Sequence, residues 1–483
     1  MTLRNPDIST VRPFPVGRAS LALLLVTVLN GCAVHTFASA DLPETPVPAN
    51  WVASNATPIA VDARMALTQW WQRFNDPLLT QLINQALQSN TDVRSAQAAL
   101  QQSRALRDGK AAGLHPTVNG SASAQHSQTV GSDAVDSFQI GFDASWEPDI
   151  FGGLRSALSA SDADAQAAQS SLAQVQVSMA AEVAVTYIDL RGLQARLAIA
   201  RSNLAAQMET LQIARWRAQA GLASSLDVEQ AVAASEQTAA QIPVLVSSLA
   251  QDHSSLAVLT GQAPGSLNAL LTGQAAIPLA PDTLALAIPA QTLRQRPDVR
   301  AAEYKVQAAL ARVSQADAAR YPGFQISGSI GLRALTLGAL SNGASTVQAL
   351  LAGVSVPLFD GGAARAQVRA QEAALEQTRV AYQATVLTAL KDVEDALVSL
   401  QSNQERLIRL QSAAEAAANA DLLSHQRYAS GLIDFRTVLD TQRTLLSTQD
   451  AVQSTRASLS ADHVRLYKAL GGGWTPEAQP SDL

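Results

Sequence analysis

The chain has 483 residues, of which 47% are hydrophobic and only 4% aromatic, with a formal net charge of −6 and a single cysteine. A net negative charge without a basic cluster argues against nucleic-acid binding, and a lone cysteine excludes internal disulfides and cysteine-based zinc sites. Abundant Ala, Gln and Ser with few aromatic residues favour long, closely packed helices over a large conventional core.

The first 31 residues have the pattern of a targeting segment. Three arginines precede an apolar stretch, residues 21–29, that is too short to span a bilayer as a helix. The stretch ends in Leu29-Asn30-Gly31-Cys32, which resembles a bacterial lipobox, and the Ala33 that follows resembles an outer-membrane sorting signal. We therefore expect a lipoprotein signal peptide over residues 1–31 and a covalent lipid on Cys32, with no other cofactor. The alternative is an ordinary signal peptide with an incidental cysteine.

Most of the remaining chain consists of two copies of one sequence unit, joined by a linker. Residues 32–62 are expected to form an extended, lipidated tether. The first repeat covers residues 63–261, a Pro-rich linker residues 262–297, the second repeat residues 298–474 and a polar tail residues 475–483. Several different short motifs recur in the same order about 206–210 residues apart, which indicates duplication. The matching pairs are Asp92-Val93-Arg94 and Asp298-Val299-Arg300, Gly152-Gly153 and Gly361-Gly362, Gly221-Leu222 and Gly431-Leu432, and Asp252-His253 and Asp462-His463.

Each repeat begins with helical sequence, including a helix over roughly residues 92–113, and continues into two candidate strands. The strand pairs are predicted within residues 117–147 and 323–357, the fourth strand near residues 348–356. Phe138, Ile140 and Phe142 alternate with polar or small residues. Each strand has about the ten residues that a tilted strand needs to cross a bilayer. Alternation alone also fits a soluble sandwich, but the lipobox favours a membrane location.

A long helical hairpin follows each strand pair, over residues 153–261 and 362–471. Residues 363–430 contain neither Gly nor Pro, and residues 154–220 contain only Gly192. At 1.5 Å per residue, each long helix should reach on the order of 100 Å. Each should stop at a Gly-Leu turn in which the glycine adopts the left-handed capping conformation. Pro243 is expected to kink the first returning helix.

Four transmembrane strands cannot close a barrel, and an open sheet edge in lipid leaves backbone groups unsatisfied. Three chains supply about twelve strands, whereas two supply about eight, whose interior side chains would fill the lumen. We therefore predict a mainly α fold with a small transmembrane β part. A homotrimeric 12-stranded β-barrel, four strands from each chain, continues into a long α-helical barrel.

Several motifs resemble the TolC/OprM family of outer-membrane efflux channels, and most closely its NodT-like lipoprotein branch. They are Trp70-Trp71…Phe74-Asn75-Asp76-Pro77, Arg296-Pro297-Asp298-Val299-Arg300, the paired hairpins, the Gly-Leu turns and Leu466-Tyr467-Lys468-Ala469-Leu470-Gly471-Gly472-Gly473-Trp474. The resemblance covers nearly the whole mature chain.

The resemblance implies a passive exit duct in the bacterial outer membrane, with its helices in the periplasm. The duct would carry small molecules and drugs for a tripartite pump, together with a periplasmic adaptor and an inner-membrane proton-driven transporter. A duct for one-step (type I) protein secretion uses the same scaffold and is the main alternative. A non-conducting, lipid-anchored coiled-coil scaffold is a more distant one.

No catalytic or metal-binding constellation is evident, so we do not expect an enzyme. His253 and His463 each follow an aspartate, but adjacent residues on a helix point apart. Their matching places in the two repeats favour a structural use.

The repeats differ just after their turns. Arg436, Asp440 and Arg443 stand in the second repeat at positions that the first repeat fills with uncharged residues, Leu226, Gln230 and Ala233. Asp440 and Arg443 can pair along one helical face. Spacing alone indicates a solvated surface pair worth under about 1 kcal/mol.

The resemblance implies more for these residues. Asp440 and Arg443 match a charged periplasmic gate, and Tyr428 matches a tyrosine that holds the gate closed. Arg436 departs from the family, which usually carries an apolar residue there. It either loosens the constriction or uses Asp440 as its counter-charge. We further hypothesise that the Gly221-Leu222 and Gly431-Leu432 turns dock the adaptor.

Overall fold

The computed structural model describes Trp51 and residues 67–280 and 290–474, apart from residues 129, 132 and 343. The predicted signal peptide, Cys32, the tether except Trp51, and the C-terminal tail lie outside these residues. The described part is mainly helical with one small sheet. None of its helices combines the length and the apolarity needed to cross a membrane.

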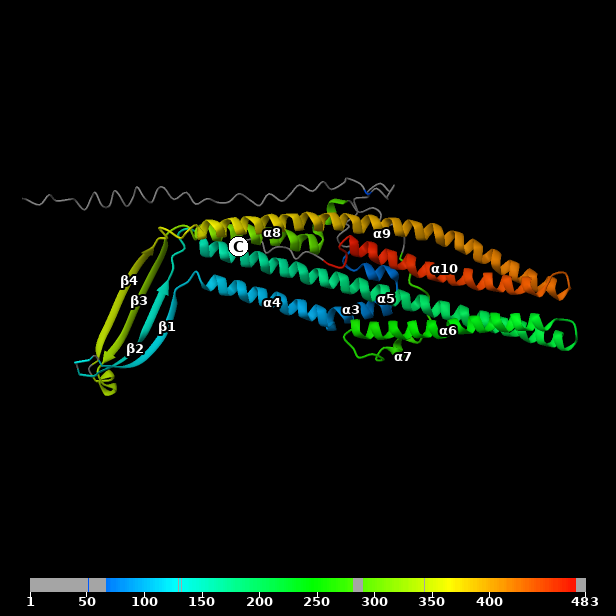
Figure 1. Cartoon of the computed structure of the whole chain (residues 1–483), viewed down its shortest axis with the longest axis horizontal. Coiled ribbons are helices and arrows are strands. Elements are labelled where there is room, and N and C mark those ends of the chain that lie inside the picture. The colour runs from blue at the N-terminus through cyan, green and yellow to red at the C-terminus, as the bar shows by residue number, and fades with distance from the viewer. Residues whose placement is uncertain are drawn as a thin grey trace, which may run out of the picture. The chain divides into compact units, whose positions relative to one another are not determined.

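The two repeats present the same order of main elements (Figure 1). The first repeat comprises η1 (Trp70–Phe74), α3 (Pro77–Ser89), α4 (Thr91–Ala112), β1 (Thr117–Ser127), β2 (Val135–Trp146), α5 (Gly153–Gln219) and α6 (Ser225–Leu259). The linker holds α7 (Asn268–Leu271) and η3 (Ala290–Gln295). The second repeat comprises α8 (Pro297–Ala318), β3 (Gly323–Ala334), η4 (Leu337–Leu340), β4 (Ser345–Ser355), α9 (Ala363–Ala429) and α10 (Phe435–Ala469).

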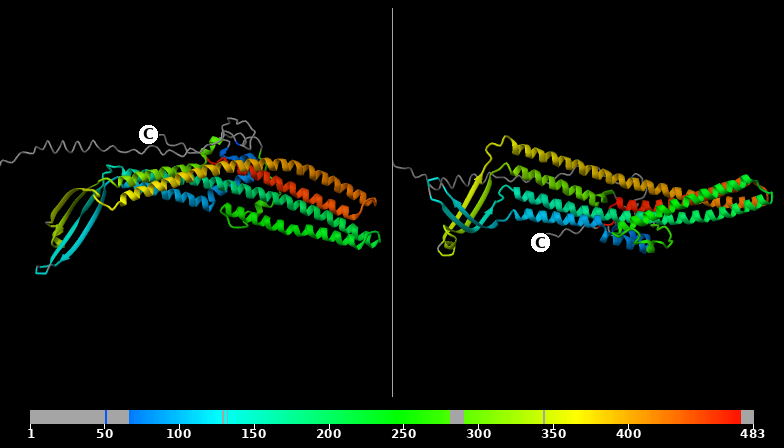
Figure 2. Two further views of the ribbon diagram at one scale, coloured as in Figure 1. Left: turned by 45° about the horizontal axis from the view of Figure 1, so that its top comes forward. Right: turned by 60° about the horizontal axis from the view of Figure 1, so that its bottom comes forward.

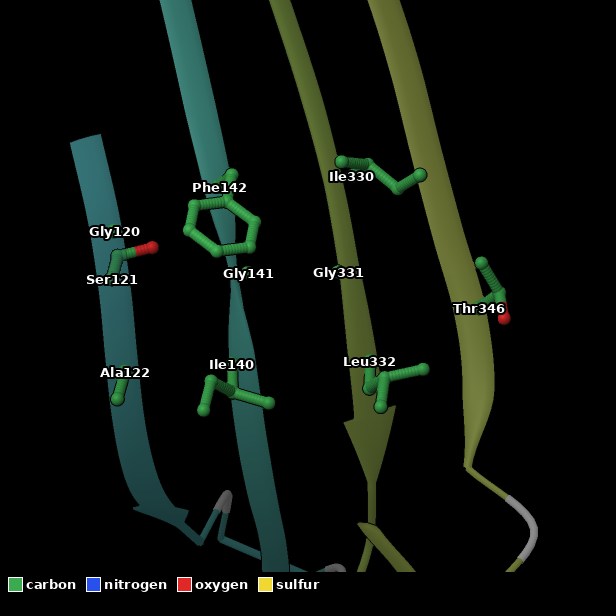
Figure 3. A pocket seen from close by; sticks show the side chains of 10 residues that line it. All are labelled: Gly120, Ser121, Ala122, Ile140, Gly141, Phe142, Ile330, Gly331, Leu332 and Thr346. Atoms are coloured by element: carbon green, nitrogen blue, oxygen red, sulfur yellow. The ribbon is translucent and has the colours of Figure 1, made fainter. Parts of the chain in front are cut away.

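The four strands form one antiparallel sheet in sequence order. Phe142 pairs with Ile330 and Ile140 with Leu332, so the apolar residues of β2 and β3 share one face and the predicted alternation is confirmed. Figure 3 shows these side chains above and below the paired Gly141 and Gly331. A Cβ on Gly141 would lie 2.8 Å from the Ile330 carbonyl oxygen, so the close approach of β2 and β3 requires glycine there.

The fourth strand differs from the prediction. It begins at Ser345 instead of near residue 348, and both Leu350 and Leu351 are exposed although they point to opposite faces. β4 is therefore apolar on both faces in its middle, and simple alternation was too weak a signal to place its start. β1 and β4 are the outer edges of the sheet.

The helices lie side by side in a fixed lateral order (Figure 2). Next to the sheet the order is α4, α5, α8, α9, and towards the Gly-Leu turns it is α6, α5, α10, α9. The sheet and the turns lie at opposite ends of the long helices (Figure 1). α5 thus has a neighbour on each flank along its whole length, whereas α9 has neighbours on one flank only.

The middle of the helical part holds the aromatic core, where the motif around Trp70 meets the motif around Tyr467. Trp70 is fully buried and stacks on Tyr467 with ring centroids 5.5 Å apart. The Gly473 N–H donates to the Leu67 carbonyl oxygen at 2.8 Å. Arg296 donates to the Ala469 carbonyl oxygen at 2.7 Å. The motif at the start of the first repeat, the Arg296 motif and the C-terminal motif of the second repeat are therefore joined in one packed cluster.

The returning helices are equal in length, 35 residues each. α6 continues through Pro243 as one helix. The predicted kink at this proline stays a prediction.

Candidate functional site

The two turns that end the long helices have the same backbone geometry. Gly221 and Gly431 have φ values of 71° and 73°, as the predicted left-handed cap requires. The Leu222 N–H donates to the Arg217 carbonyl oxygen at 2.7 Å, and Leu432 repeats this bond to Arg427 at 2.9 Å. Both leucines are exposed. The turns therefore present two similar apolar tips on rigid helix ends.

The helices that follow begin with different caps. Ser224 and Asp227 form a capping box at the start of α6. At the start of α10, the carboxylate of Asp434 accepts the Thr437 N–H at 2.9 Å. Hydrogen bonds from the side chain and backbone of Thr437 hold the pKa of Asp434 below its usual value. The Asp434 carboxylate is thus ionised at neutral pH and interacts favourably with the positive, N-terminal end of the α10 helix dipole.

Just beyond this cap, three charged side chains form a row on α10. Arg443 Nη2 lies 3.0 Å from Asp440 Oδ1, so the predicted pairing of these two residues is confirmed. Arg436 Nε lies 4.0 Å from Asp440 Oδ2 on the other side. The side chains of Arg436, Asp440 and Arg443 are 78%, 51% and 75% exposed. One carboxylate is therefore flanked by two cations, and the row faces solvent in the single chain.

Beneath this row, α10 packs on the other tip helices through an apolar cluster. Phe435 on α10 is buried with Leu211 and Ala214 on α5 and Ala231 on α6. An adjacent face of the same α10 turns carries the exposed charges. The row is consequently held on a helical surface that this cluster fixes.

Tyr428 connects the two hairpins at this level. Its ring lies 5.3 Å from the ring of Phe435. The guanidinium of Arg217, at the end of α5, lies 4.4 Å from the centre of the Tyr428 ring. A cation over a tyrosine face is worth about 0.5–1 kcal/mol at an exposed site. Tyr428 thus binds the end of α9 to the end of α5, but its gate role stays a prediction.

Further from the tip, the seam between α5 and α10 is polar, which the sequence reasoning missed. The Arg196 guanidinium pairs with Asp450 at 2.7 Å. Asn203 donates to Gln449 at 3.0 Å, and Gln442 donates to Thr210 at 2.9 Å. With Arg217, the α5 members recur every seven residues, which places them on one helical stripe. That spacing, Arg196, Asn203, Thr210 and Arg217, was a signal available in the sequence.

The repeated histidines lie in the middle of the helical part, not at the tips. His253 is buried and its Nδ1 lies 3.1 Å from Asn268 Oδ1. His463 is buried and its Nδ1 hydrogen-bonds the Leu459 carbonyl oxygen at 2.9 Å. Among the residues that the structure describes, no three His, Cys, Asp or Glu side chains are placed to hold a metal ion.

Comparisons with known proteins agree with this architecture. The family model described as outer membrane efflux protein matches residues 82–262 and 288–472. The toluene efflux pump outer membrane protein TtgI of Pseudomonas putida is 31% identical over 471 residues, 94% of this chain and 98% of its own length.

Two further comparisons point the same way. The pyoverdine export outer membrane protein OpmQ of Pseudomonas aeruginosa is 32% identical over 425 residues, 86% of this chain and 89% of its own length. A solved structure of the outer-membrane channel OprN superposes with a TM-score of 0.81 at 35% identity, covering 90% of this chain and 99% of that one. The chain therefore belongs to the outer membrane efflux protein family.

Proposed function

We propose that three copies of this chain form the outer-membrane exit duct of a tripartite efflux pump, with a gate at the tip of its helical part. The observation that carries the proposal is the uncovered second flank of α9. Val380, Leu387 and Val398 are each more than half exposed, and their spacing of seven and eleven residues places them on one face of the helix. Lys391 lies on the same face, so the face is mainly but not wholly apolar. Its exposed apolar residues need a partner that the single chain does not contain.

A neighbouring copy offers a complementary flank. α6 and α4 form the other end of the helical layer and expose Val244, Val258 and Leu106. Contact of α9 with α4 and α6 of the next copy would continue the layer into a closed ring. The sheet also needs neighbouring copies, because its edge strands β1 and β4 can form further strand pairs only with the sheets of other chains. Three sheets of four strands supply a barrel of about the size that leaves an open lumen.

The polar face of the sheet would line that lumen and its apolar face would meet lipid. On the polar face, Ser121 donates to Asp143 at 2.7 Å and Arg333 donates to Ser137 at 3.2 Å. Such a wall offers solutes hydrogen-bonding groups but no group that couples energy to transport. The duct is therefore passive in this proposal, and the energy comes from an inner-membrane transporter. The relatives' names describe efflux and export of small molecules, which supports efflux over protein secretion.

The remaining expectations complete the proposal. A lipid on Cys32 would anchor the chain, and the helices would reach into the periplasm. The Arg436–Asp440–Arg443 row would face the axis and form the gate. Arg436 has Asp440 within 4.0 Å, which supports the reading in which that carboxylate is its counter-charge.

Conductance of the purified trimer in a planar bilayer tests the gate. Asp440→Ala removes the carboxylate between two arginines, and mutual repulsion of the cations then opens the constriction, so conductance should rise. Gln230→Ala changes the repeat counterpart on α6 and should leave conductance unchanged. Equal conductance of native protein and Asp440→Ala would reduce the row to a surface ion pair.

Adaptor docking at the tips has its own test. A Cβ added at Gly221 or Gly431 would meet no neighbouring atom within 4 Å, but a bulky residue at either position strains a backbone with positive φ. Pump assembly should be lost while trimers persist. Leu222→Asp with Leu432→Asp alters the same surface without that strain and should give the same loss in a pull-down with the adaptor. Normal assembly of both double variants would place docking elsewhere.

A further inference from the structure

The single chain contains one seam of a kind that three copies would repeat between them. α5 and α9 are equivalent long helices, and α10 and α6 are equivalent returning helices, because the first residues of each pair stand 210 apart in the sequence. The seam between α5 and α10 lies within the chain (Figure 2). Its equivalent is the seam between α9 of one copy and α6 of the next, since these helices lie at opposite ends of the lateral order.

The seam within the chain shows which positions come level with each other. Arg196 of α5 pairs with Asp450 of α10 across it. Ile199 lies three residues after Arg196, and Leu446 lies four residues before Asp450, so both share the faces that meet. The two helices run in opposite directions, so both steps lead one turn towards the Gly-Leu turns. Ile199 therefore comes level with Leu446, which is only 8% exposed.

The equivalent positions of the other seam carry opposite charges. The counterpart of Ile199 is Arg409 on α9, and the counterpart of Leu446 is Glu236 on α6. Both side chains are exposed, and within the described part of the chain neither takes part in a hydrogen bond or an ion pair. α6 contains no Lys or Arg, so Glu236 has no cation on its own helix. Two apolar positions within the chain thus correspond to two complementary charges on its outer flanks.

Both charges lie on flanks that the single chain leaves open. Arg409 follows Val398 by eleven residues, about three helical turns, and so shares the exposed face of α9. Glu236 precedes Val258 by 22 residues, about six turns, and so shares the exposed face of α6. In one chain α5 and α10 separate the two helices. These charges can therefore meet only between copies.

The other charges on these flanks do not cancel the attraction. Glu405 and Arg406 lie about one turn before Arg409 on α9, and neither forms an ion pair in the described part of the chain. The three α9 side chains carry one net positive charge, which matches the negative charge of Glu236. Glu229 lies seven residues before Glu236 on the same flank of α6 and adds to its negative charge.

We propose that Glu236 of each copy pairs with Arg409 of its neighbour and that this ion pair fixes the register of the contact between α9 and α6. The inference rests on the proposed trimeric duct, of which it names one contact. Apolar helix flanks can slide along each other, whereas opposite charges set one level and place like charges together when two equal flanks meet. The pair would thus select the α9-to-α6 contact over contacts between equal helices.

Charge reversal in the purified full-length protein tests the pair. Glu236→Arg and Arg409→Glu each place like charges across the contact, and each should lower the temperature at which half of the trimers dissociate by about 5 °C or more. The double variant exchanges the two charges and should recover most of the native temperature. Native mass spectrometry after heating measures the fraction of trimers, in about 0.1 M salt, where the screening length is near 10 Å.

Glu209→Arg is the matched control. Glu209 is an exposed carboxylate of α5, a helix whose two flanks are covered within the chain, so its reversal should leave the dissociation temperature unchanged. Glu236 and Arg409 are also exposed in the single chain, so circular dichroism should show the native helical content in every variant.

The outcomes separate this pair from the proposed function. Stable native trimers, together with a double variant that is as unstable as the two single changes combined, would overturn the pair and leave the duct intact. Single variants that dissociate at the native temperature would have the same meaning. A native protein that forms no trimer would overturn the duct, and the pair with it.

Discussion

The long helices α5 and α9 have the same length, 67 residues, and the same place in their repeats, yet they differ in burial. α5 buries 25 residues in the single chain and α9 only 10. The difference comes from position: α5 lies between neighbours on both flanks, and α9 ends the layer. A duplicated sequence therefore gives one completed helix and one that lacks a neighbour, and the missing burial is the strongest physical reason to expect other copies.

The largest effect, loss of the trimer, is expected from substitutions on the flank of α9 that no other helix of the chain contacts. Leu387→Arg with Val398→Arg would place unpaired charges in the contact between copies, at a cost of several kcal/mol, on the order of that for an unpaired buried charge. Trimers should be lost while the helical content of the chain is kept, as measured by native mass spectrometry and circular dichroism.

Exposed residues of α5 provide the matched control. Met208→Arg with Trp216→Arg adds the same charge to a helix whose flanks are already covered, and trimers should persist. Stable trimers in the α9 variant would show that this flank is not the contact between copies.

A second prediction compares one position in the two repeats. A Cβ on Gly192 of α5 would lie 2.8 Å from the Cβ of Ala457 on α10, whereas the counterpart on α9, Ser402, is exposed. Gly192→Leu should force α5 and α10 apart and lower the free energy of unfolding by about 1–3 kcal/mol. Ser402→Leu should change it by less than about 0.5 kcal/mol. Denaturant unfolding measures both, and equal effects would contradict the close approach of α5 and α10.

The smallest effect is expected from Asp252 on α6, whose counterpart in the second repeat is Asp462 on α10. Burial, and then the charge of Asp189, raise the pKa of Asp252 to about 6, from a usual value of 3.8. Because the folded pKa lies above the unfolded one, the stability that the protonated carboxyl provides is lost as the pH rises from about 4 to about 6. Asp252→Asn should therefore raise the melting temperature by a few degrees at pH 7.5 and not at pH 4.

The counterpart of this residue should behave differently. Asp462 accepts bonds from Arg465 at 2.7 Å and from Asn403 at 2.6 Å. Asp462→Asn loses the ion pair and should destabilise the protein by about 1 kcal/mol at neutral pH. Stabilisation by both substitutions would mean that the two repeats do not differ in this respect.

Much of the fold could be predicted from the sequence, because local chemistry determines it. The Gly-Leu turns require positive φ, and the alternation around Phe142 and Ile330 determines which residues share a face of the sheet. The lengths of the long helices follow from the near absence of Gly and Pro between these signals, Gly192 being the exception within residues 154–220. The pairing of Asp440 with Arg443 was likewise readable from helical spacing.

The remaining features depend on which helices become neighbours, and helical periodicity does not specify a partner. The contact of Arg217 with Tyr428 joins residues of different repeats. The stack of Trp70 on Tyr467 joins the two ends of the duplicated region. The sequence analysis singled out Trp70, Tyr467 and Tyr428 but not Arg217, and it could not say which helices would bring these residues together.

The most direct test of the account is the mass and shape of the protein purified from membranes in mild detergent, by native mass spectrometry and single-particle imaging. The account predicts a particle of three chains with a continuous lumen from the sheet to the Gly-Leu turns. A stable single chain, or an oligomer without a lumen, would contradict it.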